Sequence, residues 1–294
     1  MPSKKRADDA IPAGFPAQRQ DPPGLTSLMR PQPDHGEQSY QGTGKLEGRH
    51  ALVTGGDSGI GRAVALAYAR EGADVAFTYL PEEEPDAQVT VELVTSTGRG
   101  AVPIETDLTS REGCDAAVRQ TVAALGAIDI LVNNAGYQQA RDKSVERMSD
   151  ERFDRVLRTN LYALLWTIRA ALPHMPRGSC IINTSSTQAY HPSRPLLDYA
   201  ATKAAINNLT VNLAADLGPR GIRVNAVAPG PIWTPLQPAT QPAKHMREFG
   251  SSAPLGRAGQ PAEVAPAYVF LASEADASFV SGTVLGVTGG QAVF

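Results

Sequence analysis

A tyrosine and a lysine lie four positions apart, at Tyr199 and Lys203, in a stretch whose pattern predicts a helix over residues 198–217. Side chains four residues apart share one face of a helix, so the two groups can meet. A free tyrosine has a pKa of about 10 and is a poor acid or base near neutral pH. A neighbouring ammonium favours the phenolate and lowers that pKa, so the pair predicts proton transfer at the Tyr199 hydroxyl. Such pairs also occur on ordinary helix surfaces, so the interpretation depends on the surrounding elements.

A glycine-rich turn, TGGDSGIG at residues 54–61, joins a predicted strand to a predicted helix. Gly55 allows a tight turn, Gly59 lets the backbone approach a pyrophosphate, and Gly61 lets the helix pack closely on the sheet. The helix N-terminus offers free N–H groups and the positive end of its dipole to a phosphate. The glycine spacing differs from the general Gly-x-Gly-x-x-Gly fingerprint. The strand-turn-helix context nevertheless predicts a dinucleotide site.

Short β-rich runs alternate with helix-length amphipathic stretches from about residue 45 onward. Predicted strands cover residues 50–54, 74–79, 101–105, 129–132, 180–184, 223–228 and 283–287, and predicted helices cover 59–71, 83–97, 110–125, 150–172, 198–217 and 261–272. This alternation indicates a doubly wound parallel sheet with helices on both faces. Residues 45–294 are therefore predicted to form a single α/β domain of Rossmann type, with ligands bound beyond the carboxyl ends of the strands.

Residues 1–44 differ from the rest of the chain, because they are rich in proline and glycine and lack a periodic apolar pattern. Such a segment alone cannot bury enough surface to offset the entropy lost on ordering. We predict an extended N-terminal arm that is either partly disordered or docked on the body or a neighbouring subunit, and we favour docking. The candidate anchors are Phe15, Leu25, Leu28, Met29 and Tyr40.

Composition narrows the class of function. The 294 residues include 27 basic and 30 acidic side chains, a net charge of −3, which argues against nucleic acid or an anionic membrane as partner. No run reaches the roughly 18 apolar residues of a membrane span, and no signal peptide is evident. Cys114 and Cys180 are far apart and expected to be buried, and no His, Cys and carboxylate cluster suggests a metal. We expect a cytoplasmic protein.

A series of motifs resembles, in order, the short-chain dehydrogenase/reductase superfamily. They are TGGDSGIG at 54–61, Asn133-Asn134-Ala135-Gly136, Tyr199-Ala200-Ala201-Thr202-Lys203, Pro229-Gly230 and a C-terminal stretch that begins GRAGQPAEVA. The resemblance covers about residues 45–294. The proline-rich N-terminal extension and the motifs TGGDSGIGR, SSTQAY and APGPIWT are similar to a narrower bacterial branch described as aldehyde reductases or stress-associated oxidoreductases.

The resemblance implies a catalytic set. Tyr199 would exchange a proton with the substrate oxygen while a nicotinamide cofactor carries the hydride. The family serine lies 13 positions before the tyrosine, which points to Ser186 rather than Ser185, and its hydroxyl would hold the substrate oxygen. Asn160 matches the fourth member and would link Lys203 to solvent through water. The resemblance also implies a homotetramer.

The resemblance and the glycine turn together assign the cofactor-binding residues. They are Gly55, Asp57, Ser58, Gly59, Ile60, Gly61, Tyr79, Leu80, Asp107, Leu108, Asn134, Ala135, Gly136, Tyr199, Lys203, Pro229, Gly230 and Ile232. Asp107 is also a candidate for the N-cap of the helix that follows it.

The end of the second predicted strand bears on the choice between NAD and NADP. An acid there binds the ribose 2′-hydroxyl of NAD, but Tyr79 and Leu80 occupy these positions. No arginine or lysine follows that could hold a 2′-phosphate, and the glutamates at 82–84 disfavour one. Arg62 could offset those acids. The sequence therefore favours NAD and leaves NADP open.

The expected substrate contacts are Gln138, Gln188, Tyr190 and Trp233, the last in a proline-rich loop that could close as a lid. No arginine in the predicted substrate region is evidently placed to bind a carboxylate or phosphate of a substrate. This favours small neutral aldehydes, ketones, polyols or sugars as substrates. We predict reduction of an aldehyde or ketone, with a sugar or polyol dehydrogenase and a 3-oxoacyl reductase as alternatives. A cofactor-binding regulator without chemistry is disfavoured, because the tyrosine and the lysine are both present.

Overall fold

A computed structural model describes residues 14–140 and 144–294, and within them the strands form one parallel sheet of seven strands. The strands are β1 (His50–Val53), β2 (Asp74–Tyr79), β3 (Ala101–Glu105), β4 (Ile130–Asn133), β5 (Cys180–Thr184), β6 (Arg223–Pro229) and β7 (Val284–Val287). Their order is β3-β2-β1-β4-β5-β6-β7. The direction of winding reverses between β1 and β4, and ligands bind at such a switch point in sheets of this kind.

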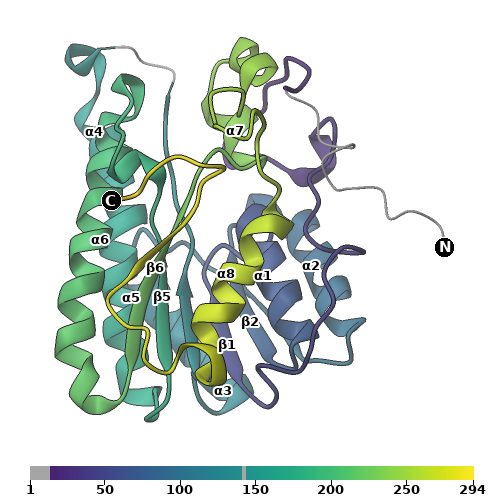
Figure 1. The fold of residues 1–294 in the computed structure, drawn as a ribbon, viewed down its shortest axis with the longest axis vertical. Coiled ribbons are helices and arrows are strands. Elements are labelled where there is room, and N and C mark those ends of the chain that lie inside the picture. The colour runs from purple at the N-terminus through teal and green to yellow at the C-terminus, as the bar shows by residue number, and fades with distance from the viewer. Residues whose placement is uncertain (1–13, 141–143) are drawn as a thin grey trace.

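Two layers of helices cover the sheet (Figure 1). One layer holds α1 (Gly59–Arg70), α2 (Glu84–Thr95) and α8 (Pro261–Ala272), and the other holds α3 (Arg111–Leu125), α5 (Ala163–Ala171) and α6 (Leu197–Leu217). The shorter helices are α4 (Asp150–Leu157), α7 (Leu236–Thr240) and α9 (Glu274–Ala277). Strand β1 shows how the layers are built, because Ala51 and Val53 pack toward α1 and α8 while Leu52 packs toward the other layer.

The predicted fold class is confirmed, and most predicted elements agree closely with the structure. The strand predicted at 74–79 has the bounds of β2, and the helix predicted at 261–272 has those of α8. The helix predicted over 150–172 is instead divided, because a π-helical turn at Arg158–Tyr162 separates α4 from α5. Asn160 lies in that turn.

Three further observations bear on the predictions made from composition. Cys114 and Cys180 are buried free thiols, as the sequence predicts. In the described part of the chain, no helix combines the length and the apolar character needed to cross a membrane. Over the same residues, no group of three or more His, Cys, Asp or Glu side chains is arranged to hold a metal ion.

The described part of the N-terminal arm, residues 14–44, lies against its own body and passes from α7 along α1 and α2 (purple in Figure 1). Phe15 is buried and stacks on Trp233, with ring centroids 3.7 Å apart and planes 5° from parallel. The Phe15 amide also donates to the Met246 carbonyl at 2.9 Å. The arm therefore fastens the segment that follows β6.

The other predicted anchors behave differently from one another. Met29 is fully buried in the cluster around Trp233, and Tyr40 packs on the core beneath α1 and α8. Leu25 is half-buried. Leu28 is 58% exposed and is not an anchor, because the short turn Thr26–Leu28 buries Thr26 and leaves Leu28 outside.

Replacing Phe15 with alanine should release the arm from the body. The substitution removes a buried aromatic stack, and losses of this kind cost several kcal/mol when the site cannot collapse. We expect amide hydrogen exchange in residues 14–31 to become about a hundredfold faster, since each 1.4 kcal/mol of local stability is about tenfold in opening. Leu28→Ala on the same arm is the control and should leave exchange unchanged. Equal exchange in wild type and Phe15→Ala would show that the stack does not hold the arm.

Candidate active site

Helix α6 brings the side chains of Tyr199 and Lys203 to the carboxyl end of β5. The Lys203 Nζ atom lies 5.3 Å from the centroid of the Tyr199 ring, as expected for residues on one helix face. Lys203 Nζ also donates to the carbonyl of Thr184, the last residue of β5, at 2.7 Å. The start of α6 is fixed by Asp198, whose buried carboxylate accepts bonds of 2.8 and 3.0 Å from the Arg152 guanidinium.

Burial governs how the two groups titrate. It raises the pKa of Tyr199 to about 12, although a hydrogen bond with Ser186 acts in the opposite direction. Burial also lowers the pKa of Lys203 to about 7. The sequence-based expectation that Lys203 lowers the tyrosine pKa is not met, because burial is the larger influence on Tyr199 and Lys203, with a pKa of about 7, is only about half protonated at neutral pH. Tyr199 is protonated under those conditions.

The two serines after β5 have different partners. The Ser186 hydroxyl bonds with the side chain of Tyr199 and accepts from the Gln188 amide at 3.1 Å. The Ser185 hydroxyl instead donates to the carbonyl oxygen of Lys203 at 3.3 Å. Ser186 is therefore the serine beside the tyrosine hydroxyl, the place that the resemblance implied for it.

Asn160 occupies the π-helical turn, a feature frequently found at functional sites. Its side-chain oxygen accepts from the Tyr137 amide at 2.8 Å, and its nitrogen donates to the Tyr137 carbonyl and to Thr202 Oγ1, both at 3.0 Å. Asn160 and Lys203 both line a small cavity of about 10 Å³. That volume is close to the smallest that holds a water molecule.

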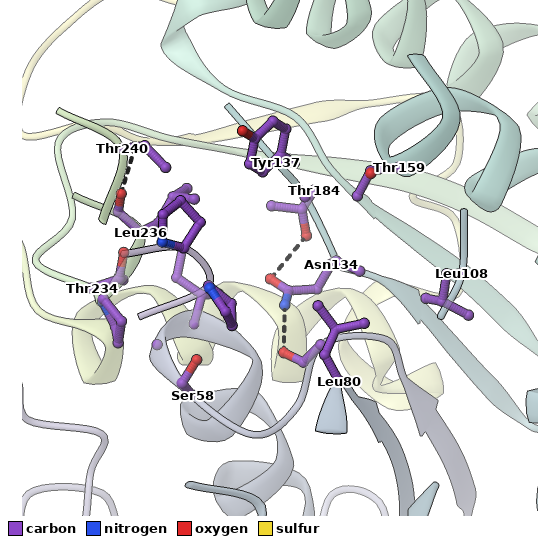
Figure 2. A pocket seen from close by; sticks show the side chains of 18 of the residues that line it. Ser58, Leu80, Leu108, Asn134, Tyr137, Thr159, Thr184, Thr234, Leu236 and Thr240 are labelled. Atoms are coloured by element: carbon purple, nitrogen blue, oxygen red, sulfur yellow. Dashed lines mark hydrogen bonds between the residues drawn. The ribbon is translucent and has the colours of Figure 1, made fainter. Parts of the chain in front are cut away.

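A cavity of about 550 Å³ opens beyond the carboxyl ends of the strands, within the usual range for small-molecule sites. Figure 2 shows Ser58, Asn134 and Thr184 around it. The Asn134 amide nitrogen donates to the carbonyls of Thr54 and Gly55 at 3.1 and 3.0 Å, and its oxygen accepts from Thr184 at 3.5 Å. Asn134 thus ties the glycine turn to the strand ends beside Tyr199.

The glycine turn has a shape that fits the diphosphate of a dinucleotide. Gly55 and Gly59 have φ of 63° and 50°, and a Cβ on Gly59 would lie 3.0 Å from Thr234. A Cβ on Gly61 would lie 1.8 Å from the Gly55 carbonyl oxygen, so this glycine serves close packing. Ser58 is the N-cap of α1 but makes no capping bond with its side chain in the described structure. The backbone N–H groups in the first turn of α1 are therefore available to bind an anion.

The residues assigned to the cofactor from the sequence line this cavity, with Gly61 as the exception because it packs behind the turn. Their contacts with a cofactor stay a prediction. The alternative role of Asp107 as a helix N-cap is wrong, because Ser110 caps α3 by accepting from the Gly113 amide at 3.1 Å.

Arg62 cannot offset acids beside the cofactor in the way expected from the sequence. Its guanidinium is buried and pairs with the Asp86 carboxylate at 3.0 Å. It also donates to the backbone carbonyls of Asp57 and Asp86 and to Thr90. These bonds hold the guanidinium between α1 and α2 rather than in the cavity.

The expectation that Trp233 lines the substrate pocket is wrong. Its side chain is fully buried, stacks on Phe15 and donates from Nε1 to the Pro31 carbonyl at 2.9 Å. The arm therefore covers the indole, and Trp233 does not line the cavity.

The three other predicted substrate residues also lie outside the described cavity wall. Gln138 is buried and donates to Thr240 Oγ1 at 3.0 Å, and Gln188 accepts from the amide and hydroxyl of Ser193. Tyr190 is half-buried after the short turn Thr187–Ala189. The side-chain amides of Gln138 and Gln188 thus bond to neighbouring segments of the protein.

Residues that the sequence interpretation missed line the cavity instead. Tyr137, Leu236 and Thr240 face it in Figure 2, and the Arg155 guanidinium lies 4.3 Å over the centroid of the Tyr137 ring. Arg158 also lines the cavity and pairs with Asp154 at 2.6 Å, so arginines are present, contrary to expectation. The place of Tyr137 directly after the Asn-Asn-Ala-Gly motif is the signal that could have found it.

Comparison with known proteins places this geometry among enzymes. The family model described as enoyl-(acyl carrier protein) reductase matches residues 55–292. The chain is 48% identical to the glucose and ribitol dehydrogenase of Daucus carota, over 95% of this chain and 97% of that protein. It is also 48% identical to the chloroplastic NADPH-dependent aldehyde reductase 1 of Arabidopsis thaliana, over 92% of this chain and 96% of that protein.

A solved structure shares the fold. The short chain dehydrogenase of Burkholderia cenocepacia J2315, determined in complex with NADP, superposes with a TM-score of 0.77 at 37% sequence identity. The match covers 84% of this chain and 99% of that one.

Proposed function

The chain belongs to the short-chain dehydrogenase/reductase superfamily and is an NAD(P)-dependent oxidoreductase of carbonyl and alcohol groups, and we propose that it reduces small neutral aldehydes with NADPH. The observation that carries this proposal is the meeting of Tyr199, Ser186 and the glycine turn around one cavity.

The residues have distinct roles in the proposed reaction. The Tyr199 hydroxyl donates its proton to the carbonyl oxygen of the aldehyde, and Ser186 holds that oxygen by a second hydrogen bond. The bound nicotinamide supplies the hydride that reaches the carbonyl carbon. Lys203 then returns a proton to Tyr199, and the small cavity that Lys203 and Asn160 both line has about the volume of the one water molecule that would resupply Lys203.

The titration of Tyr199 supports reduction as the favoured direction. Reduction needs the phenol as an acid, whereas oxidation of an alcohol needs the phenolate as a base. Burial holds the tyrosine pKa at about 12, so the acid form is the one present at neutral pH. The Tyr199 phenol ionises only as the pH rises toward that pKa. The rate of alcohol oxidation should therefore increase under alkaline conditions, whereas the rate of carbonyl reduction should not.

The cavity supports a neutral substrate. Tyr137 contributes an aromatic ring and Leu236 an apolar side chain to its wall, and Thr240 lies beside them with its hydroxyl bonded to Leu236 and Gln138 (Figure 2). Of the two arginines in this wall, Arg158 pairs with Asp154 at 2.6 Å and the Arg155 guanidinium lies over the Tyr137 ring, so both cations already have partners within the chain.

The choice of NADPH rests on relatives. One relative is named an NADPH-dependent aldehyde reductase, and one related structure holds NADP. The preference for NAD expected from the sequence finds no such support.

We also propose that the chain forms a homotetramer. The large side chains of Tyr162 and Val211 are 44% and 56% exposed at the start of α5 and on α6, which suits burial between subunits. Light scattering after size-exclusion chromatography should give four times the chain mass, and a monomer would contradict the proposal.

A substrate panel tests the proposed reaction. Purified protein with NADPH should consume small neutral aldehydes near neutral pH, measured by the loss of nicotinamide absorbance. Polyols or sugars with NADP⁺ should react faster as the pH rises, and 3-oxoacyl thioesters should react poorly. Polyols and sugars are included because the Daucus carota relative is named a glucose and ribitol dehydrogenase. Turnover of polyols or 3-oxoacyl thioesters, with none of aldehydes, would contradict the proposal.

A further inference from the structure

Two prolines of the N-terminal arm, Pro22 and Pro23, line the main cavity together with the glycine turn and Tyr199. Both prolines are half-buried. The family model begins at residue 55, so the two prolines lie outside the residues that it matches. The arm is therefore part of the wall of this cavity, in addition to holding the segment that follows β6.

On one side, the arm contacts the segment that covers the glycine turn. A Cβ on Gly24, the residue after the two prolines, would lie 3.0 Å from the Pro235 carbonyl oxygen. The Gln20 amide donates to the Pro238 carbonyl in α7 at 3.0 Å. Pro235 also reaches the glycine turn, because its Cδ atom would lie 3.9 Å from a Cβ on Gly59. A single residue thus separates this part of the arm from the turn.

On the other side, the arm is bonded to α2. The Thr26 amide donates to the Asp86 carboxylate at 2.8 Å, and that carboxylate pairs with the Arg62 guanidinium at 3.0 Å. Arg62 Nε in turn donates to the Asp57 carbonyl in the glycine turn at 2.8 Å. Thr26, Asp86 and Arg62 are all buried, and hydrogen bonds are stronger where water is excluded. Residues 22–26 are therefore connected to the glycine turn from two directions.

The last part of the arm, residues 36–44, is held elsewhere. The Tyr40 hydroxyl and the Thr43 amide donate to the Glu71 carboxylate at 2.5 and 2.8 Å, and the Arg70 guanidinium donates to backbone carbonyls of this segment. These contacts lie at the end of α1, whereas the glycine turn lies at its start. None of residues 36–44 belongs to the described cavity wall. This segment is therefore an internal reference that a ligand in the cavity should not affect.

We propose that Pro22 and Pro23 contact the bound dinucleotide, so that docking of residues 14–31 and binding of the cofactor favour each other, an inference that rests on the cofactor of the proposed function and not on its substrate. A pyrrolidine ring has no backbone N–H that would need a partner, so it can form an apolar wall without an unsatisfied donor. Apolar surface of the two rings that the cofactor covers contributes favourably to binding.

Thermodynamic linkage relates the two events. If the docked arm raises the affinity for NADP⁺ by some factor, bound NADP⁺ must favour the docked arm by the same factor. Couplings of this kind typically lie between about 5-fold and about 150-fold. We therefore expect saturating NADP⁺ to slow amide hydrogen exchange in residues 14–31 by about fivefold or more, and to leave exchange in residues 36–44 unchanged.

Hydrogen exchange and equilibrium titration of the full chain without substrate test the inference. Pro22→Ala and Pro23→Ala each remove a ring from the cavity wall and keep the buried anchors Phe15 and Met29. Each variant should bind NADP⁺ about fourfold more weakly in isothermal titration calorimetry, the contribution of about one buried methylene group. NADP⁺ should also protect residues 14–31 less in both variants than in wild type. Exchange without nucleotide shows whether each variant still docks its arm.

Pro16→Ala is the matched control, because Pro16 is exposed on the same arm and lies outside the cavity wall. It should keep the wild-type affinity and protection, and circular dichroism should show that all variants are folded. Unchanged NADP⁺ affinity in both Pro22→Ala and Pro23→Ala would overturn the inference, and so would equal exchange of residues 14–31 in wild type with and without either nucleotide.

Other outcomes separate this inference from the proposed function. Protection of residues 14–31 by NAD⁺ and not by NADP⁺ would support the contact with the arm and contradict NADPH as the cofactor. Protection by NADP⁺ without turnover of any aldehyde would likewise support the contact and contradict the proposed reaction alone.

Discussion

Replacing Tyr199 with phenylalanine should lower kcat/KM for aldehyde reduction by about 10²–10⁴-fold, the usual contribution of a positioned acid. The substitution removes only the hydroxyl that bonds with Ser186 and keeps the ring that packs beside Lys203. The proton must then come from water, which neither lies in a fixed place nor lines up with the carbonyl oxygen. Steady-state rates with NADPH and a small aldehyde measure the effect.

Cofactor binding provides the internal check on this variant. NADP⁺ affinity should be largely retained in Tyr199→Phe, because the variant loses only one hydroxyl among the residues assigned to the cofactor and leaves the glycine turn and the strand ends in place. Tyr190→Phe makes the same chemical change outside the cavity wall and should keep full activity. Wild-type turnover by Tyr199→Phe would remove the tyrosine from the mechanism.

Replacing Arg62 with methionine should destabilise the fold by about 3–5 kcal/mol, the range for a buried ion pair that loses one partner. The Asp86 carboxylate would remain buried, facing only the Thr26 amide at 2.8 Å and without its cation. Denaturant unfolding followed by circular dichroism should show the loss. The effect would mark Arg62 as a structural residue between α1 and α2.

The matching double variant separates charge from packing. Arg62→Met with Asp86→Asn removes both charges and keeps an acceptor for the Thr26 amide, so it should recover much of the lost stability. Lys45→Met breaks an exposed pair with Asp276 and should change stability little. A single Arg62→Met variant as stable as wild type would contradict the account of this pair.

The framework of the fold could be predicted because each element carries its own local signal. The apolar run at 74–79 and the turn at 54–61 specify β2 and the start of α1 by short-range preferences. The catalytic set followed from the resemblance to a family whose motifs occur here in the same order. The preference for Ser186 over Ser185 depended only on its distance from Tyr199, and the structure brings Ser186 to that hydroxyl.

The substrate wall could not be predicted in the same way, because it depends on contacts between distant segments. Nothing near Trp233 in the sequence indicates that Phe15, more than two hundred positions earlier, covers its ring. In the sequence, Arg62 likewise has no evident partner, and only the packing of α2 against α1 brings Asp86 to it. The pKa of a side chain also depends on how deeply it is buried, which the sequence does not give. The nearness of Lys203 alone therefore did not predict the pKa of Tyr199.

The most direct test of the central claim is to follow the hydride itself. Purified protein would be incubated with a small neutral aldehyde and NADPH carrying deuterium at both C4 positions of the nicotinamide, and the product analysed by mass spectrometry. We predict an alcohol with a single deuterium on its carbinol carbon in wild type, and almost none formed by Tyr199→Phe. An unlabelled alcohol, or no alcohol from wild type with any aldehyde of the panel, would contradict NADPH-dependent reduction at this site.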